Sequence, residues 1–143
     1  MRNNQPITQR ERTFAAQQRL ISTTDAKGVV RFAMGFEVTS YSKLLYRASA
    51  DAAWQVVNDE KASGRVERAI GFSADNAVAY LQVETPAGPD AIVAFDVASG
   101  TRRPVFQDAR VDPWRIIRSH GFAGSPVGVM VMKVPSADRL ISC

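Results

Sequence analysis

The sequence predicts an all-β protein built from antiparallel β-propeller blades, about two and a half of them in an incomplete ring, behind a short polar N-terminal extension. Short runs rich in Val, Ile, Phe and Tyr alternate with polar turn clusters, which is typical of β-strands. The pattern also repeats at an offset of about 49 residues, and a period of roughly 40 to 50 residues that holds four strands is typical of a propeller blade. We therefore divide the chain into an extension over 1–20 and blade repeats over 21–143.

The extension is polar and basic. Residues 1–19 hold four arginines against a single acid, Glu11, and show no sustained alternation of polar and apolar side chains. We expect a leader or a short helix, in which residues 8–20 would make about three turns. The N-terminus lacks the hydrophobic core of a signal peptide, and no window has the apolar length of a membrane span. We expect a cytoplasmic protein with no membrane partner.

The repeat places each strand of one unit over a strand of the next. In the first two units, the aligned pairs of segments are 21–32 over 70–81, 43–47 over 92–96, and 54–57 over 103–106. The polar turn at 25–28 keeps its place in this alignment. A third copy begins at Ser119, where Gly124-Ser125-Pro126 replaces the turn and 127–132 replaces the second strand, and it stops at Cys143.

The second unit contains the clearest hairpin. Strands at 78–84 and 91–96 flank a connection at 85–90, whose two prolines and one glycine should not continue a ladder. After the hairpin, Asp96 can accept hydrogen bonds from nearby backbone amides and Gly100 can adopt a positive φ, which predicts a tight turn into the outer strand. The segment 108–119 is expected to be a loop that crosses to the next blade.

The positive charge does not indicate a nucleic-acid partner. The net charge is +4, but acids stand between the basic residues, and no basic stripe or helix forms. We expect these side chains to lie on solvated strand edges and turns: Arg31, Lys43, Arg47, Lys61, Arg65, Arg68, Arg102, Arg103 and Arg118.

The candidates for catalysis and metal binding are few. His120 is the only histidine and Cys143 the only cysteine, which excludes an internal disulfide and leaves too few ligands for a zinc site of recognisable spacing. The segment Gly71-Phe72-Ser73-Ala74-Asp75 has an aspartate where a nucleophile elbow needs its second glycine. We expect His120 to be structural, at the position of a blade strand. No catalytic, cofactor-binding or metal-binding residue is predicted, and no cofactor.

The remaining polar and aromatic candidates are also better explained by structure. Gly64 and Gly88 stand alone and form no phosphate-binding cluster. Trp54 and Trp114 are a possible ligand-stacking pair, but we favour packing between blades. Paired carboxylates for acid–base chemistry remain open, although turn positions account for each acid: Asp51, Asp59, Glu60, Asp90, Asp96, Asp108 and Asp112.

Two stretches resemble known families. Residues 71–76, 79–81, 88–90 and 94–103, with Leu44-Leu45-Tyr46-Arg47 and Trp54 before them, resemble the N-terminal β-propeller of prolyl oligopeptidase-like (S9) serine peptidases. The likeness covers about residues 21–133. It implies a propeller that caps the active site and filters substrates by size, while the catalytic triad lies in a separate α/β-hydrolase domain. No catalytic residue is therefore carried over to this chain.

The second resemblance is local. Residues 1–6, 8–11 and 20–28 are similar to the start of the flavin-binding PAS domain of aerotaxis receptors. The later histidine- and arginine-containing segment of that family is absent here. This alternative implies a sensory or ligand-binding domain with one antiparallel sheet and flanking helices.

The sequence thus favours a non-catalytic propeller fragment of an S9-like peptidase over a PAS-like sensor. Its expected partners are a second copy of the chain or a missing α/β-hydrolase domain, and a peptide substrate only through such a domain. Two and a half blades would leave two open faces. We expect Phe32, Tyr46, Leu81, Phe95 and Met130 at the contacts between blades.

Overall fold

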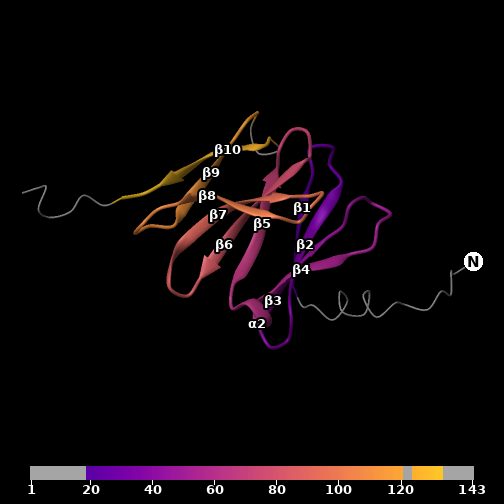
Figure 1. The fold of residues 1–143 in the computed structure, drawn as a ribbon, viewed down its shortest axis with the longest axis horizontal. Helices are drawn as coiled ribbons and strands as arrows, with labels where there is room; N and C mark the ends of the chain where they lie inside the picture. Colours follow the sequence, from indigo (N-terminus) through magenta and orange to yellow (C-terminus); the bar gives the residue numbers. More distant parts are fainter. Residues whose placement is uncertain (1–18, 121–123, 134–143) are drawn as a thin grey trace, which may run out of the picture.

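The fold is all-β and antiparallel. The computed structural model describes residues 19–120 and 124–133, which form three sheets (Figure 1). The first sheet contains β1 (Arg19–Thr24), β2 (Val30–Phe36), β3 (Ser42–Tyr46) and β4 (Gln55–Asp59). The second contains β5 (Val66–Phe72), β6 (Val78–Thr85), β7 (Gly88–Asp96) and β8 (Arg102–Gln107). The third contains β9 (Pro113–Arg118) and β10 (Pro126–Val131).

Each sheet is a meander in which consecutive strands pair. The strand orders are β1-β2-β3-β4, β5-β6-β7-β8 and β9-β10, and none of these sheets closes on itself within the described residues. A four-residue helix, α2 (Glu60–Ser63), links the first two sheets; Asp59 caps its start and Gly64 ends it at φ 70°. No helix in the described part of the chain is long and apolar enough to cross a membrane.

The pairing registers repeat from sheet to sheet. The third residue of the first strand pairs with the fifth residue of the second strand in all three: Ile21 with Met34, Arg68 with Gln82, and Arg115 with Met130. The second strands begin at Val30, Val78 and Pro126, so the repeat is about one residue shorter than the offset of about 49 that the sequence predicts. The described residues form three such sheets, whereas a PAS-like domain would have one sheet with flanking helices.

The first two sheets pack face to face through aromatic side chains. Phe32 lies 4.9 Å from Tyr46 in its own sheet, and 5.6 and 6.0 Å from Phe72 and Phe95 in the second sheet, measured between ring centroids. Leu81 is fully buried in the same cluster. The predicted contact residues of these two sheets are therefore confirmed. Met130 is the exception, because it is 42% exposed on the two-stranded third sheet.

The third unit begins earlier than predicted. The segment 108–119, expected to be a loop, contains β9, which pairs antiparallel with β10. Proline is compatible with the first position of an edge strand because no ladder hydrogen bond is required of it there. Pro113 holds that position, so it starts the strand, and the third unit begins there and not at Ser119.

The hairpin of the second sheet is confirmed, with a shorter connection than expected. Thr85 pairs with Gly88, so that only Pro86 and Ala87 form the turn. Pro89 is tolerated in β7 because the pairing of β7 with β8 starts beyond it, at Ala91. The closing turn is as predicted: Asp96 accepts from the Ala98 and Ser99 amides, and Gly100 has φ 73°.

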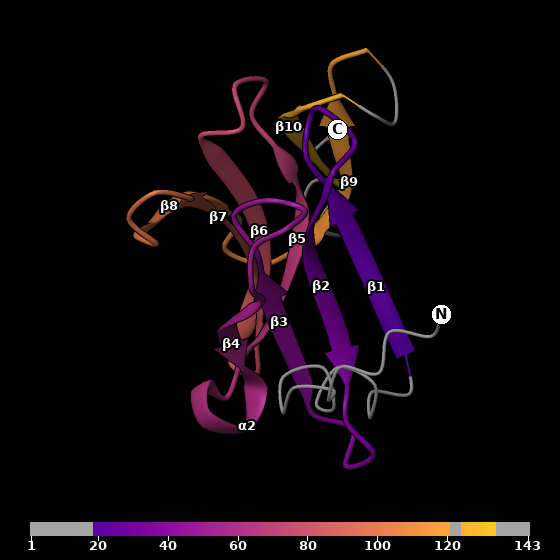
Figure 2. The ribbon, with the colours of Figure 1, turned by 90° about the vertical axis from the view of Figure 1, so that its right-hand side faces the viewer.

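Equivalent parts of successive sheets lie next to each other. Thr23 in β1 donates its hydroxyl to the Ala69 carbonyl in β5 at 3.1 Å, and the Ala26 amide donates to Asn76 Oδ1 at 2.8 Å. The β1–β2 turn therefore lies against the β5–β6 turn. In Figure 2 the first strands β1, β5 and β9 lie toward one side, and the fourth strands β4 and β8 toward the other. Cys143 falls outside the described residues. Most of the predicted helix over 8–20 does as well, and its last two residues, Arg19 and Leu20, begin β1.

Candidate functional site

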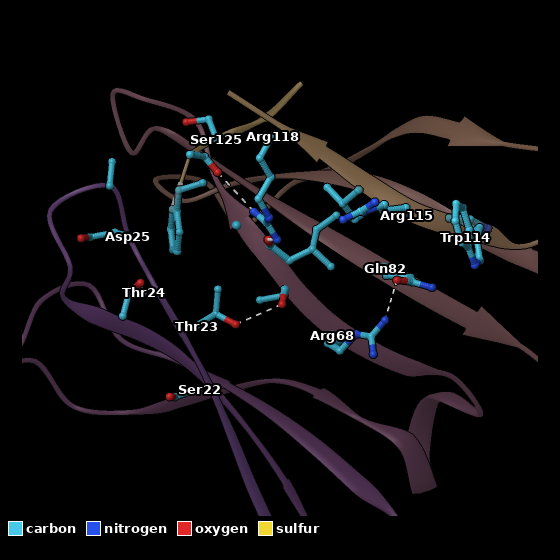
Figure 3. Close-up of a pocket in the computed structure, with 18 residues that line it drawn as sticks. Ser22, Thr23, Thr24, Asp25, Arg68, Gln82, Trp114, Arg115, Arg118 and Ser125 are labelled. Atoms are coloured by element: carbon cyan, nitrogen blue, oxygen red, sulfur yellow. Dashed lines mark hydrogen bonds between the residues drawn. The ribbon is translucent and has the colours of Figure 1, made fainter. Parts of the chain in front are cut away.

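A polar pocket lies where the first strands of the three units meet. Its volume is about 480 Å³, and its walls come from β1, β5 and β9, from Gln82 of β6, and from the turns that follow β1 and precede β10. Three arginines from β5 and β9 enter it (Figure 3): Arg68, Arg115 and Arg118. This site combines positive charge with backbone carbonyls and a few apolar side chains.

Arg118 joins β9 to β5. Its guanidinium donates to the Ile70 carbonyl and, at 3.4 Å, to the Gly124 carbonyl. Ile70 is the extra residue of a β-bulge, because Ala69 pairs with Leu81 and Gly71 with Tyr80. A bulge removes one residue from regular pairing. The carbonyl of Ile70 is thereby available to Arg118.

Arg68 is held by a chain of polar contacts. Its guanidinium donates to Gln82 Oε1 at 2.7 Å, and Gln82 Nε2 donates to Asp90 Oδ2 at 2.6 Å. The Asp90 amide in turn donates to Asp112 Oδ1 at 2.8 Å. Gln82 is buried, so these contacts fix a half-buried guanidinium at the pocket and tie β5 to the segment that starts β9.

Of the three arginines, Arg115 has the fewest side-chain partners among the described residues. It is exposed, and its side chain forms no hydrogen bond or ion pair with any residue within 19–120 or 124–133. In the view of Figure 3 its side chain extends toward Arg118. Arg68 and Arg115 are the third residues of β5 and β9, so the repeat itself places a guanidinium at equivalent points of neighbouring strands.

The acid in the pocket does not balance these charges. Among the described residues that line it, Asp25 is the only carboxylate, and it is paired with Arg31 at 3.1 Å. Burial alone would raise the pKa of Asp25, but hydrogen bonds from the Val29 and Lys27 amides and the Arg31 guanidinium outweigh burial. The pKa therefore lies below the usual 3.8. Asp25 is ionised at neutral pH, and its negative charge pairs with the Arg31 guanidinium.

The expected structural roles of the acids agree with their contacts. Asp96 and Asp108 accept backbone amides in their turns, Asp59 caps α2, and Glu60 accepts from the Ser42 amide. Those amide hydrogen bonds hold the pKa of Asp96 below its ordinary value. Asp90 and Asp112 belong to the chain that fixes Arg68, and Asp51 is an exposed turn residue. Their contacts give no pair that is arranged for acid–base chemistry.

His120 does not lie in a strand as predicted. It occupies the exposed β9–β10 turn with φ 52°, and within the described residues it contacts no serine hydroxyl by a hydrogen bond. The difference arises because β9 ends at Arg118, two residues before His120. The described residues also contain no group of three or more His, Cys, Asp or Glu side chains that could hold a metal ion.

The two tryptophans are not brought together in the pocket. Trp54 precedes β4 and lies under the guanidinium of Arg47, at 4.6 Å from its ring centroid. Trp114 lies on β9 at the edge of the pocket and is 57% exposed. Trp114 thus does not have the predicted buried position between blades.

The pocket arginines are not recognisable as a group from the sequence. Arg68 and Arg118 belong to the basic residues expected on strand edges and turns, and Arg115 is not among the candidates. The signal was present in the spacing, because Arg68 and Arg115 occupy equivalent positions of the repeat. This equivalence is visible only when β9 is a strand, whereas the sequence predicts a loop over 108–119.

No protein-family model matches the chain, and no solved structure matches it.

Proposed function

We propose that the three sheets are consecutive blades of a β-propeller, the third described through its first two strands. We further propose that this propeller is a non-catalytic module that controls the access of peptides to an α/β-hydrolase domain, as in prolyl oligopeptidase-like serine peptidases. The observation that carries the proposal is the position of β1, β5 and β9, the first strands of three successive units, around one polar pocket.

Two features of the packing support a propeller arrangement. Propeller blades are four-stranded antiparallel sheets arranged around a central channel. Here two meanders of four strands stack face to face, with Phe32 and Tyr46 against Phe72 and Phe95. Equivalent strands also adjoin, as the contact between Thr23 and Ala69 illustrates. The pocket then corresponds to a section of the channel wall.

The chemistry of peptide hydrolysis is assigned to a separate domain. A serine nucleophile needs a base within hydrogen-bond reach. His120 is the only histidine of the sequence, and it is exposed in the β9–β10 turn without a hydrogen bond to any serine hydroxyl of residues 19–120 and 124–133. The module therefore contributes binding and gating to the proposed function.

A fluorophosphonate probe for serine hydrolases tests this function. An antibody raised against the chain would isolate the native polypeptide, and peptide mapping would locate the labelled serine. We expect labelling of the native polypeptide at a serine outside residues 1–143, and no labelling of the isolated 143-residue chain, which serves as the control. An unlabelled native polypeptide, or a labelled serine within the chain, would contradict the proposal.

A further inference from the structure

The pocket has an unbalanced positive charge. Arg68, Arg115 and Arg118 have no carboxylate within ion-pair distance among the described residues, and Asp25, the one acid in the lining, is engaged by Arg31. Elsewhere in the described structure, Arg31 and Arg102 pair with carboxylates, and half-buried Arg47 donates to two backbone carbonyls. The pocket thus gathers in one place three arginines without a carboxylate partner among the described residues.

The arginines retain donors for a ligand. A guanidinium carries five N–H donors. Arg118 uses some of them on the Ile70 and Gly124 carbonyls, Arg68 uses one on Gln82, and Arg115 uses none within the described residues. Arg118 is therefore chiefly a structural residue, while Arg68 and Arg115 present free N–H groups. Planar pairs of such donors match the geometry of a carboxylate.

The size of the pocket indicates a molecule larger than a simple ion. Ligand pockets typically measure about 300 to 1,000 Å³, and this one measures about 480 Å³. Its walls also include apolar side chains, Ile70, Phe72 and Ile116. A ligand with one charged group and a less polar body therefore fits better than a free inorganic anion.

We propose that this pocket binds a carboxylate-bearing ligand, with the carboxylate held by Arg115 and Arg68, and that the ligand is a short peptide bound through its free C-terminal carboxylate. The choice of a peptide rests on the proposed function, whereas the carboxylate site rests on the arginines alone. Gln82 and Asp90 are positioning residues, because Gln82, which also lines the pocket, holds the Arg68 guanidinium and Asp90 holds Gln82.

Calorimetric titration of the purified chain tests the proposal. The probes are N-acetyl-trialanine with a free C-terminal carboxylate and the same peptide with a C-terminal amide. We expect the acid to bind and the amide to bind at least about tenfold more weakly, because a charge-assisted pair is lost. Arg115→Gln should weaken binding of the acid by a similar factor. Raising the salt concentration should also weaken it.

Arg103→Gln is the matched control. Arg103 is exposed on β8 and does not line the pocket, so this variant removes the same charge elsewhere and should bind the acid as the wild type does. Circular dichroism would check that both variants fold; if Arg115→Gln does not, the acid and amide titrations of the wild type still decide.

Equal binding of the acid and the amide, or unchanged binding in a folded Arg115→Gln variant, would overturn the site. Inorganic phosphate is the third probe. If phosphate binds as tightly as the peptide acid, the peptide assignment is wrong. These titrations use the isolated chain, so their failure is distinct from a failure of hydrolase labelling in the native polypeptide.

Discussion

Arg118 occupies the space that a side chain at Gly71 would need. A Cβ atom built on Gly71 would lie 2.8 Å from Arg118 Nη1 and 2.9 Å from Pro126 Cδ. Gly71 also has φ 151°, a conformation that residues with side chains rarely adopt. The glycine follows the bulge at Ile70, whose carbonyl accepts from Arg118. The third sheet is therefore attached to the second at a point where β5 lacks both a side chain and regular pairing.

The Gly71→Ala variant should lose stability for two reasons, steric conflict with β9–β10 and an unfavourable backbone conformation. We expect a loss of about 2–4 kcal/mol in the free energy of unfolding, measured with urea. Gly100→Ala is the control, because Gly100 has φ 73° but nothing within 4 Å of a built Cβ. It should lose only about 1–2 kcal/mol. Equal losses in the two variants would show that Arg118 and Pro126 do not restrict this position.

Arg102 should stabilise the packing of the first sheet against the second. Glu67 is 1% exposed, and its Oε2 atom accepts from Arg102 at 2.8 Å, while Arg102 also donates to the Val57 carbonyl of β4. Arg102→Met would leave the Glu67 carboxylate buried with only Arg65, 3.8 Å away. Removing one partner of a buried pair typically costs about 3–5 kcal/mol.

Arg103→Met, on the exposed side of the same strand, should change the free energy of unfolding by less than about 0.5 kcal/mol. The double variant Glu67→Gln with Arg102→Met should recover part of the loss, because no uncompensated charge remains. If Arg102→Met is as mild as the control, or the double variant recovers nothing, the pair does not have this role.

Asp25 should make stability depend on pH. Its pKa is lowered in the folded state because the Val29 and Lys27 amides and Arg31 together outweigh burial. Such a group stabilises the fold above its unfolded pKa of about 4, and this contribution disappears as the pH falls through the folded pKa. We expect Asp25→Asn to cost about 1–3 kcal/mol at pH 7.

The difference between the wild type and Asp25→Asn should shrink steadily below about pH 4. Urea unfolding across this range would measure it, with Asp51→Asn, in an exposed turn, as the control. A difference that stays constant down to about pH 2 would mean that the ionised carboxylate of Asp25 contributes nothing to the stability of the fold.

Much of the fold follows from local sequence patterns. The hairpin of β6 and β7 is marked by two runs of β-forming residues, and the turn after β7 by Asp96 and Gly100, whose side-chain and backbone chemistry is local. The aromatic contacts between sheets also follow from the repeat, since Tyr46 and Phe95 lie at related points of it. Local patterns of this kind are visible without any knowledge of the packing.

The site did not follow from the sequence, because it depends on contacts between strands of different sheets. Pro113 and Asp112 resemble loop residues, and only the edge position of β9 makes a strand start at Pro113 compatible with pairing. The approach of Arg118 to Ile70 requires a bulge, and the isolated Gly71 in β5 is compatible with one but does not identify the side chain that approaches it. The acids interspersed among the basic residues also hide the site, because those between Arg68 and Arg115 in the sequence contact other groups.

The isolated chain should self-associate, because apolar side chains are exposed at both ends of the stack of sheets. Pairing places Leu20 and Val56 on the face of the first sheet opposite Phe32, and they are 49% and 54% exposed. Val127 and Met132 are exposed at the other end. Exposed apolar side chains on outer sheet faces favour association when they form a patch. Size-exclusion chromatography with light scattering should show a mass that increases with concentration, and Leu20→Lys with Val127→Lys should reduce it.

A monomer whose mass does not change with concentration, and whose unfolding midpoint is high, would contradict self-association. It would also mean that the two outer faces need no partner, and the open-propeller arrangement would have to be abandoned.

The side-by-side position of equivalent turns in successive sheets is the central claim, and a disulfide cross-link measures it most directly. The Ala26 amide lies 2.8 Å from Asn76 Oδ1, and two cysteines bridge only when their Cα atoms are within about 7 Å. With Cys143→Ser as background, Ala26→Cys with Asn76→Cys should cross-link rapidly under mild oxidation. Ala26→Cys with Ala87→Cys is the control, because Ala87 lies in the turn at the opposite end of the second sheet. Rapid cross-linking of the first pair alone is the predicted result. Absence of the cross-link, or equal rates for both pairs, would contradict the stacking of the sheets on which the pocket and its proposed function depend.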